Sequence, residues 1–181
     1  ELSKKLNCHP VIANLLLQRG ICTFEDAQAF FKPALNMLHD PFEMRDMDKA
    51  VERLDRAIAD KEKILIYGDY DVDGTTAVAL LYRYLKNHCN SENLEYYIPD
   101  RYIEGYGVSI KGIDYAAENG FSLMLITDCG IKAIEKVKHA NSRKVDVIIC
   151  DHHTPGDTLP DAVAVLDPQR KDCNYPYKWL S

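Results

Sequence analysis

The sequence contains no run of about 18 consecutive apolar residues, the length that an α-helix needs to cross a bilayer. It also opens without the basic segment and apolar stretch of a secretory signal peptide. No internal repeat or low-complexity segment interrupts it. We therefore expect a cytoplasmic globular protein that avoids membranes. A chain of 181 residues is long enough for one ordinary domain and a small appendage.

Close cysteine pairs are absent, although the chain has six cysteines. No C-x-x-C spacing occurs among them, and zinc ligands usually come in such pairs. The positions are Cys8, Cys22, Cys89, Cys129, Cys150 and Cys173. This usage predicts reduced thiols in a cytosolic protein.

An excess of basic residues is also missing. The chain has 22 Lys and Arg against 28 Asp and Glu, a net charge of −6. Taken alone, this charge disfavours nucleic-acid binding, because such domains tend to be basic. The objection weakens if the carboxylates hold metal, since two divalent cations add four positive charges. Charge is therefore a weak discriminator of function here.

The apolar pattern changes near residue 63. Helices are expected before it at residues 9–19, 23–31 and 49–61. Strands are expected after it at 64–68, 94–98, 123–127, 145–150 and 162–166, and helices at 75–87, 109–120 and 131–140. Continuous apolar strands that alternate with helices predict an α/β fold, with a mostly parallel sheet flanked by helices. Strand order is not predicted.

Acidic residues follow three of these strands directly. Asp69, Asp71 and Asp73 come after the first, Asp128 after LMLIT, and Asp151, His152 and His153 after VDVIIC. The carboxyl edge of a parallel sheet is where ligands bind in open α/β folds. A single acid there most often caps the next helix. Three such clusters, one with adjacent histidines, instead predict a functional site.

A calcium loop is the first interpretation of Asp69, Asp71, Asp73 and Gly74. Its twelfth position should hold a bidentate Glu, but Leu80 stands there. A strand also precedes the segment where an EF-hand needs a helix. We therefore reject this interpretation.

A phosphatase nucleophile is the second interpretation, because Asp71 to Thr75 matches the D-x-D-G-T motif of haloacid-dehalogenase-like enzymes. Those enzymes need a later pair of acids to hold magnesium. No second acid follows Asp128 closely. This interpretation also leaves His152 and His153 without a role.

A two-metal site is the third interpretation, and it uses all three clusters. Two divalent ions can clamp a phosphate and share an activated water. Carboxylates together with imidazole suit Mn²⁺ better than Ca²⁺. Gly68 and Gly74 would allow the turn between them to fold closely around the ions.

Three segments, GDYDVDGTT, ITDCGI and CDHHTP, resemble motifs I, II and III of the DHH phosphoesterase superfamily. Within it the sequence is most similar to the RecJ branch of single-strand-specific 5′→3′ exonucleases. This similarity extends to LLLQRGI (15–21), LHDPFEMRDMDKAVERL (38–54) and PDRYIEGYG (99–107). It implies an enzyme of DNA repair and recombination that hydrolyses phosphodiesters with two divalent cations, Mn²⁺ or Mg²⁺.

The resemblance also implies roles for the site residues. The expected metal ligands, with Asp69 joining or supporting them, are Asp71, Asp73, Asp128 and His152. His153 would contact the scissile phosphate, and Asp151 would orient a histidine or bind metal indirectly. These two are the expected catalytic residues.

Two further residues are candidates for substrate binding. Arg101 is expected at the phosphate of the 5′ end, with an exposed surface Arg as the alternative. Tyr106 is expected to stack on a base, with packing as the alternative.

The resemblance further implies a fragment of a longer protein. Residues 1–45 would form a helical segment and residues 46–181 a DHH domain truncated at its C-terminal part. The family's fourth motif and its DHHA1 domain have no counterpart in the sequence. The start at Glu1 and the end at Ser181 also suggest a piece of something longer.

Two other functions stay open. One is a superfamily relative that cleaves oligonucleotides, cyclic dinucleotides or pyrophosphate, but Tyr67 stands where those enzymes usually carry His. The other is a non-catalytic RecJ-like scaffold, which the intact motifs disfavour. Expected partners are single-stranded DNA, a helicase and a single-strand-binding protein, and we expect a monomer.

Overall fold

The structure is a computed structural model that describes residues 1–180. The chain forms two compact units, residues 1–39 and the residues from Asp40 onwards. The first unit contains α1 (Leu2–Leu6), α2 (Pro10–Gln18), α3 (Phe24–Phe31) and the 3₁₀ turn η1 (Leu35–Met37). Its small core joins Leu2, Ala13, Leu16 and Ala27. Thr23 and Asp26 form a reciprocal capping box that starts α3, as their spacing predicts.

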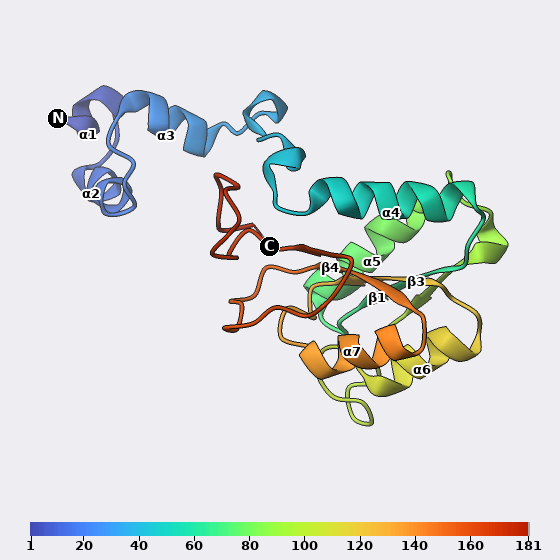
Figure 1. The fold of residues 1–181 in the computed structure, drawn as a ribbon. Coiled ribbons are helices and arrows are strands. Elements are labelled where there is room, and N and C mark those ends of the chain that lie inside the picture. Colours follow the sequence, from blue (N-terminus) through green and yellow to red (C-terminus); the bar gives the residue numbers. More distant parts are fainter. Residues whose placement is uncertain (181) are drawn as a thin grey trace. The chain divides into compact units, whose positions relative to one another are not determined.

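The second unit is built on a sheet of five parallel strands (Figure 1). The strands are β1 (Ile64–Gly68), β2 (Leu94–Tyr97), β3 (Leu123–Thr127), β4 (Asp146–Cys150) and β5 (Ala164–Leu166). Their order in the sheet is β2-β1-β3-β4-β5. The predicted parallel α/β fold is therefore confirmed.

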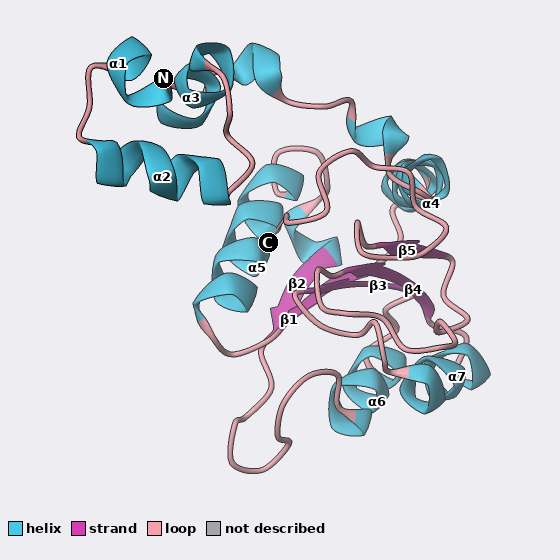
Figure 2. Ribbon diagram, turned by 90° about the vertical axis from the view of Figure 1, so that its left-hand side faces the viewer, coloured by secondary structure: helices cyan, strands magenta, loops and turns pink. Residues whose placement is uncertain are grey.

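Helices cover both faces of this sheet (Figure 2). They are α4 (Met47–Ala59), α5 (Val72–Leu85), α6 (Ile110–Glu118) and α7 (Ile134–Ser142), with the 3₁₀ turns η2 (Pro41–Glu43) and η3 (Ser91–Asn93). Successive side chains along a strand point to opposite faces of the sheet, and each face has its own hydrophobic core. Ile64 and Ile66 pack with α4 and α5, whereas Leu65 and Tyr67 pack with α6 and α7. Burial on both faces explains why these strands are apolar throughout.

Two helices begin later or earlier than the sequence pattern predicts. Helix α5 starts at Val72 instead of residue 75, because the Asp71 side chain caps it by accepting a hydrogen bond from Gly74 N. Helix α7 starts at Ile134 instead of residue 131, because the preceding loop turns at Gly130 with a φ of 108°. The short helix α1 was not predicted.

Arg53 ties α4 to the amino-terminal edge of the sheet. It is 5% exposed, and its Nε donates to Asp146 Oδ2 at 2.6 Å. Its second guanidinium branch donates to Glu62 Oε2 at 2.7 Å. Glu62 also accepts a short hydrogen bond from Ser122. This charged cluster lies at the opposite edge from the acids that follow β1, β3 and β4.

Two further features concern the cysteines and the lengths of the helices. All six cysteines are free thiols. Within residues 1–180, no helix is both long and apolar enough to cross a membrane.

Candidate functional site

The three acidic clusters lie side by side at one edge of the sheet. They follow β1, β3 and β4, which are direct neighbours in the strand order. The chain passes from β1 to β2 on one side and returns to β3 on the other, so β1 and β3 flank a topological switch point. Such a point is the usual ligand crevice of open α/β sheets.

The first cluster begins with a completely buried carboxylate. Asp69 is 0% exposed, and its Oδ1 accepts a hydrogen bond from Gly107 N at 3.1 Å. Its Oδ2 is buried and has no hydrogen-bond partner in the described part of the chain. A buried carboxylate oxygen without a partner is costly unless a cation or proton compensates it.

Asp71 and Asp73 are exposed on the turn that leads into α5. Asp71 Oδ1 accepts from Gly74 N at 3.1 Å, and this bond is the main reason why the pKa of Asp71 is lowered. Asp73 lies in the first turn of the same helix, where its negative charge interacts favourably with the helix dipole and stabilises the helix. Helix capping and metal binding are thus compatible roles for these acids.

Gly74 allows this turn to close as tightly as it does. A Cβ at Gly74 would lie 2.4 Å from the backbone oxygen of Asp69. A Cβ at Gly68 would lie 2.3 Å from Val78 Cγ2. Real Cβ contacts are longer than this, so a side chain at either position would force its neighbours to shift.

Asp128 faces the histidine of the third cluster. Its Oδ1 lies 3.0 Å from His152 Nε2. Burial raises the pKa of Asp128, the hydrogen bond from His152 opposes this, and the nearby Asp71 carboxylate raises it further. Asp128 also has a left-handed φ of 59°, an uncommon conformation that Asp tolerates better than most residues.

Asp151 organises the loop that carries both histidines. Its Oδ1 accepts from the backbone of His152 at 2.7 Å and of His153 at 3.1 Å, and from His153 Nδ1 at 2.7 Å. Its Oδ2 accepts from Ile131 N at 2.9 Å. Both oxygens are therefore occupied, which favours an orienting role over direct metal binding.

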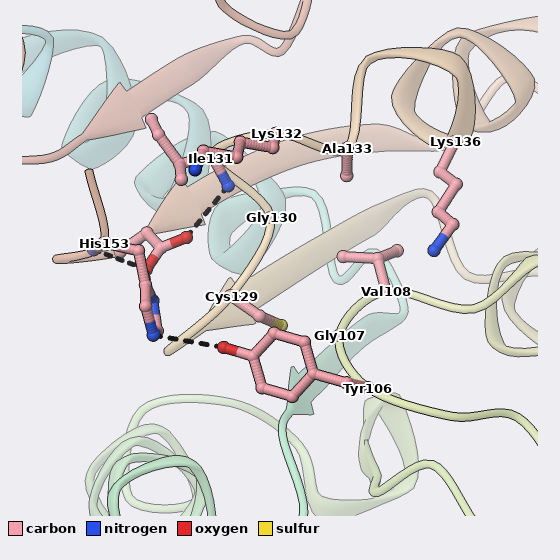
Figure 3. Close-up of a pocket in the computed structure, with 11 residues that line it drawn as sticks. Tyr106, Gly107, Val108, Cys129, Gly130, Ile131, Lys132, Ala133, Lys136 and His153 are labelled. Carbon is pink, nitrogen blue, oxygen red and sulfur yellow. Dashed lines mark hydrogen bonds and ion pairs between the residues drawn. The ribbon is translucent and has the colours of Figure 1, made fainter. Parts of the chain in front are cut away.

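His153 points towards the Tyr106 hydroxyl with one ring nitrogen (Figure 3) and contacts Asp151 with the other. Burial lowers the pKa of His153, but the Asp151 hydrogen bond and charge outweigh this, so the net pKa is raised. The other ring nitrogen, Nε2, lies 3.1 Å from the Tyr106 hydroxyl. This Asp151–His153–Tyr106 chain joins residues 47 positions apart in sequence, so the sequence alone did not indicate it.

Tyr106 and Arg101 lie on the loop after β2. Tyr106 is 56% exposed and makes edge contacts with Tyr70 and His153. Burial of the hydroxyl, followed by nearby acidic groups that include Asp69, raises the pKa of Tyr106 to about 12, so the phenol stays neutral. The exposed Arg101 guanidinium stands 5.1 Å from the centre of the Tyr70 ring.

Glu104 fixes this loop, a role the sequence did not suggest. Its carboxylate accepts from Tyr97 Oη at 3.0 Å, from Asp100 N at 3.0 Å and from Ser109 Oγ at 2.6 Å. These bonds close the loop on itself and set the position of Tyr106 beside the third cluster.

Asp167 is a second completely buried acid, and it was not among the predicted site residues. Its Oδ1 accepts from Gln169 N at 2.6 Å, and its buried Oδ2 has no partner within residues 1–180. Burial raises the pKa of Asp167 to about 6. Gln169 in turn donates to the carbonyl of His152. The available signal was the same as for Asp128, an acid directly after a strand.

Divalent cations fit this donor set. Asp128, His152 and His153 each offer one ligand atom, and these atoms lie within 4.8 Å of one another. The uncompensated oxygens of Asp69 and Asp167 indicate a site with surplus negative charge. Carboxylates with imidazole are typical ligands of Mn²⁺ and related ions.

Two hollows flank the acids. One, of about 230 Å³, lies between the 106–108 loop and the 128–133 loop and is bordered by His153 (Figure 3). The other, of about 670 Å³, lies on the side of Asp128 and His152, where α5 contributes Val72 and Leu80.

Comparison with known proteins matches residues 63–177 to the family described as "DHH family, N-terminal domain". The chain belongs to the DHH family. It is 42% identical over 181 residues to the single-stranded-DNA-specific exonuclease RecJ of Bacillus subtilis (strain 168), covering the whole chain but 23% of that protein. It is 35% identical over 173 residues to RecJ of Escherichia coli (strain K12), covering 95% of the chain and 29% of that protein.

Two solved structures agree with this membership. RecJ in complex with Mn²⁺ from Thermus thermophilus superposes with a TM-score of 0.71 and 26% identity, covering 97% of the chain and 24% of that structure. An exonuclease RecJ bound to manganese superposes with a TM-score of 0.66 and 32% identity, covering 75% of the chain and 34% of that structure. The chain is thus homologous to RecJ exonucleases over its whole length, but it spans only about a quarter of the curated relatives.

Proposed function

We propose that this chain is part of a single-stranded-DNA-specific exonuclease that removes mononucleotides from the 5′ end by metal-assisted phosphodiester hydrolysis. One observation supports it most. Three acidic clusters meet at adjacent strand ends, in a chain that is homologous to RecJ throughout. The proposal places the protein in the cytoplasm, in DNA repair and recombination.

The proposed metal ligands are Asp71, Asp73, Asp128 and His152, supported by the buried Asp69. When bound, two divalent cations, Mn²⁺ or Mg²⁺, would activate a water and neutralise phosphate charge. Asp71 and Asp73 sit on the turn that Gly74 closes, and Asp128 and His152 already face one another at 3.0 Å. Among the described residues, the group whose ligand atoms lie within 4.8 Å of one another consists of Asp128, His152 and His153, and Asp69, Asp71 and Asp73 lie outside it.

His153 is proposed to contact the scissile phosphate. Asp151 holds its Nδ1, so Nε2 is the nitrogen that faces the open pocket. The raised pKa favours the protonated ring, which donates a charge-assisted hydrogen bond to a phosphoryl oxygen. In the structure, Nε2 bonds to the Tyr106 hydroxyl. A bound phosphate would take the place of this hydroxyl as the partner of Nε2.

Arg101 and Tyr106 are proposed to bind the DNA itself. Arg101 is exposed and sits on the same loop as Tyr106, so its guanidinium is free to meet a phosphate at the 5′ end. The exposed ring of Tyr106 supports base stacking, while its hydroxyl bond supports a second role in placing His153.

The test uses the full-length protein with Mn²⁺ and single-stranded DNA labelled at either end, because the chain spans only part of its relatives. We expect immediate release of the 5′ label as mononucleotide and loss of this release in Asp128→Ala. Cleavage of pyrophosphate or dinucleotides with intact DNA would assign another activity of the superfamily. No cleavage of any substrate would support a scaffold role.

A second variant tests the division of labour between the histidines. His153→Ala should lower turnover far more than Mn²⁺ affinity, whereas His152→Ala should weaken Mn²⁺ binding itself. Calorimetric titration measures the Mn²⁺ affinity of each variant and so distinguishes the two roles. Collapse of metal binding in His153→Ala would overturn the role proposed for it. Binding of a helicase or a single-strand-binding protein, and a monomeric state, remain proposals that pull-down and light scattering would test.

A further inference from the structure

The hollow of about 230 Å³ beside His153 differs from the rest of the site in its charge (Figure 3). The acids that follow β1, β3 and β4 make the carboxyl edge of the sheet strongly negative. Asp151 also lines this hollow, but its two oxygens are occupied by donors of the chain, and the wall adds two lysines, Lys132 from the 128–133 loop and Lys136 from the first turn of α7. A polyanion that approaches the site meets these positive charges beside the reacting group.

Lys136 extends into the hollow instead of away from it. Figure 3 shows its side chain running from α7 towards the loop that carries Val108.

Neither lysine has a partner that would explain its position. Within residues 1–180, no carboxylate lies within ion-pair distance of Lys132 or Lys136, and neither amine donates a hydrogen bond. Lys136 is nevertheless half-buried. Two lysines in one hollow without a carboxylate partner offer positive charge to an anion that enters it.

The size and lining of the hollow limit what that anion can be. Ligand pockets for whole drug-sized molecules usually measure about 300–1,000 Å³, so this hollow takes only part of a nucleotide. Val108, Cys129 and Ile131 give it an apolar wall, and the lysines give it a cationic rim. A phosphate with the sugar attached to it matches both properties.

We infer that the hollow between the 106–108 loop and the first turn of α7 is a subsite for a nucleotide phosphate next to the scissile one, with Lys136 as its main anion-binding group and Lys132 as an auxiliary. His153 borders the same hollow, so a phosphate bound there lies one step along the strand from the reacting group. The identity of the ligand rests on the proposed function. The presence of an anion subsite rests on the two lysines.

The experiment compares Lys136→Met with Lys138→Met in the full-length protein. Lys138 is an exposed lysine of the same helix that does not line the hollow, so it controls for loss of charge on α7. The probe is dye-labelled oligothymidylate with phosphorothioate linkages that prevent turnover. Anisotropy with Mn²⁺ gives its affinity at several salt concentrations, and thermal melting confirms that each variant is folded.

We expect Lys136→Met to weaken binding about tenfold, the value of one charge-assisted contact. The slope of log affinity against log salt should fall by about 0.7, as expected for one phosphate on single-stranded DNA. Lys136→Arg should recover most of the affinity, and Lys138→Met should resemble the wild type. If Lys136→Met loses affinity only for a 5′-phosphorylated probe, the subsite binds the terminal phosphate. If it loses affinity equally for a 5′-hydroxyl probe, the subsite binds an internal phosphate.

Equal affinity and salt slope for Lys136→Met and Lys138→Met would overturn the subsite, and so would failure of the wild type to bind either probe. Unmodified DNA is assayed in parallel. If the wild type binds the probe and loses affinity with Lys136→Met, yet cleaves no DNA, the proposed nuclease function fails while the subsite stands.

Discussion

Asp167→Asn should stabilise the metal-free protein at neutral pH. Asp167 is 0% exposed, one of its oxygens has no partner within residues 1–180, and burial raises the pKa of its carboxyl from 3.8 to about 6. Because one pKa unit corresponds to about 1.4 kcal/mol, this rise amounts to about 3 kcal/mol of unfavourable free energy when the group is ionised. Asparagine keeps the shape and removes the charge.

The sign follows from proton binding. Between pH 3.8 and about 6 the folded state holds the Asp167 proton more tightly than the unfolded chain, so its contribution to stability falls as pH rises through this window. Above about pH 7 the penalty is complete. The amide that the substitution introduces would leave one N–H without an acceptor, which costs about 1–3 kcal/mol. We therefore expect a net gain of up to about 2 kcal/mol at pH 7.5, and a net loss of about 1–2 kcal/mol at pH 4, where the charge penalty is nearly absent and the amide cost remains.

Urea denaturation of the 181-residue chain in EDTA, at pH 4 and pH 7.5, measures this difference. Asp157→Asn is the matched control, because Asp157 is exposed and lies in the segment between β4 and β5. A gain for Asp167→Asn that is the same at both pH values would refute the electrostatic argument. Loss of stability at pH 7.5 would show that the carboxylate has a partner that compensates it.

Three other substitutions test separate parts of the structure. Gly74→Ala places a Cβ 2.4 Å from the Asp69 backbone oxygen, so it should cost about 1–3 kcal/mol in denaturation and abolish the nuclease activity proposed for the full-length protein; wild-type activity would contradict the close approach. Tyr106→Phe removes the hydroxyl bond to His153 and should lower kcat about two- to tenfold, with unchanged kcat as the contrary result. Arg53→Met should lower stability by about 2 kcal/mol, measured by urea denaturation, and leave Mn²⁺ affinity unaltered.

The sheet was predictable because its strands are short apolar runs with clear limits. β1 and β3 cover the residues predicted for them, Ile64–Gly68 and Leu123–Thr127, since both strands are buried along their whole length. Strand order was not predictable, because it depends on contacts between segments far apart in sequence. That order places the acids after β1, β3 and β4 next to one another. The sequence located the acids along the chain, but only the fold brings them to one place.

The candidate site was predictable where a residue type and a strand end coincide, as for Asp128. Roles that depend on tertiary contacts were not. Nothing in the sequence pairs Tyr106 with His153 or Gln169 with the carbonyl of His152. The start of α5 was misplaced for a related reason. Asp71 was weighed as a metal ligand or a nucleophile and not as a cap, although its carboxylate caps the helix.

The carboxylates of the site divide into two classes by their hydrogen bonds. Asp151 has both oxygens occupied by donors from the chain, and it holds the two histidines in position. Asp69 and Asp167 are buried deeper, and each keeps one oxygen without a donor in the described part of the chain. A site intended only for structure would satisfy the deepest acids first. The opposite distribution means that the metal-free fold carries an electrostatic cost, which a bound cation would relieve and thereby stabilise the fold.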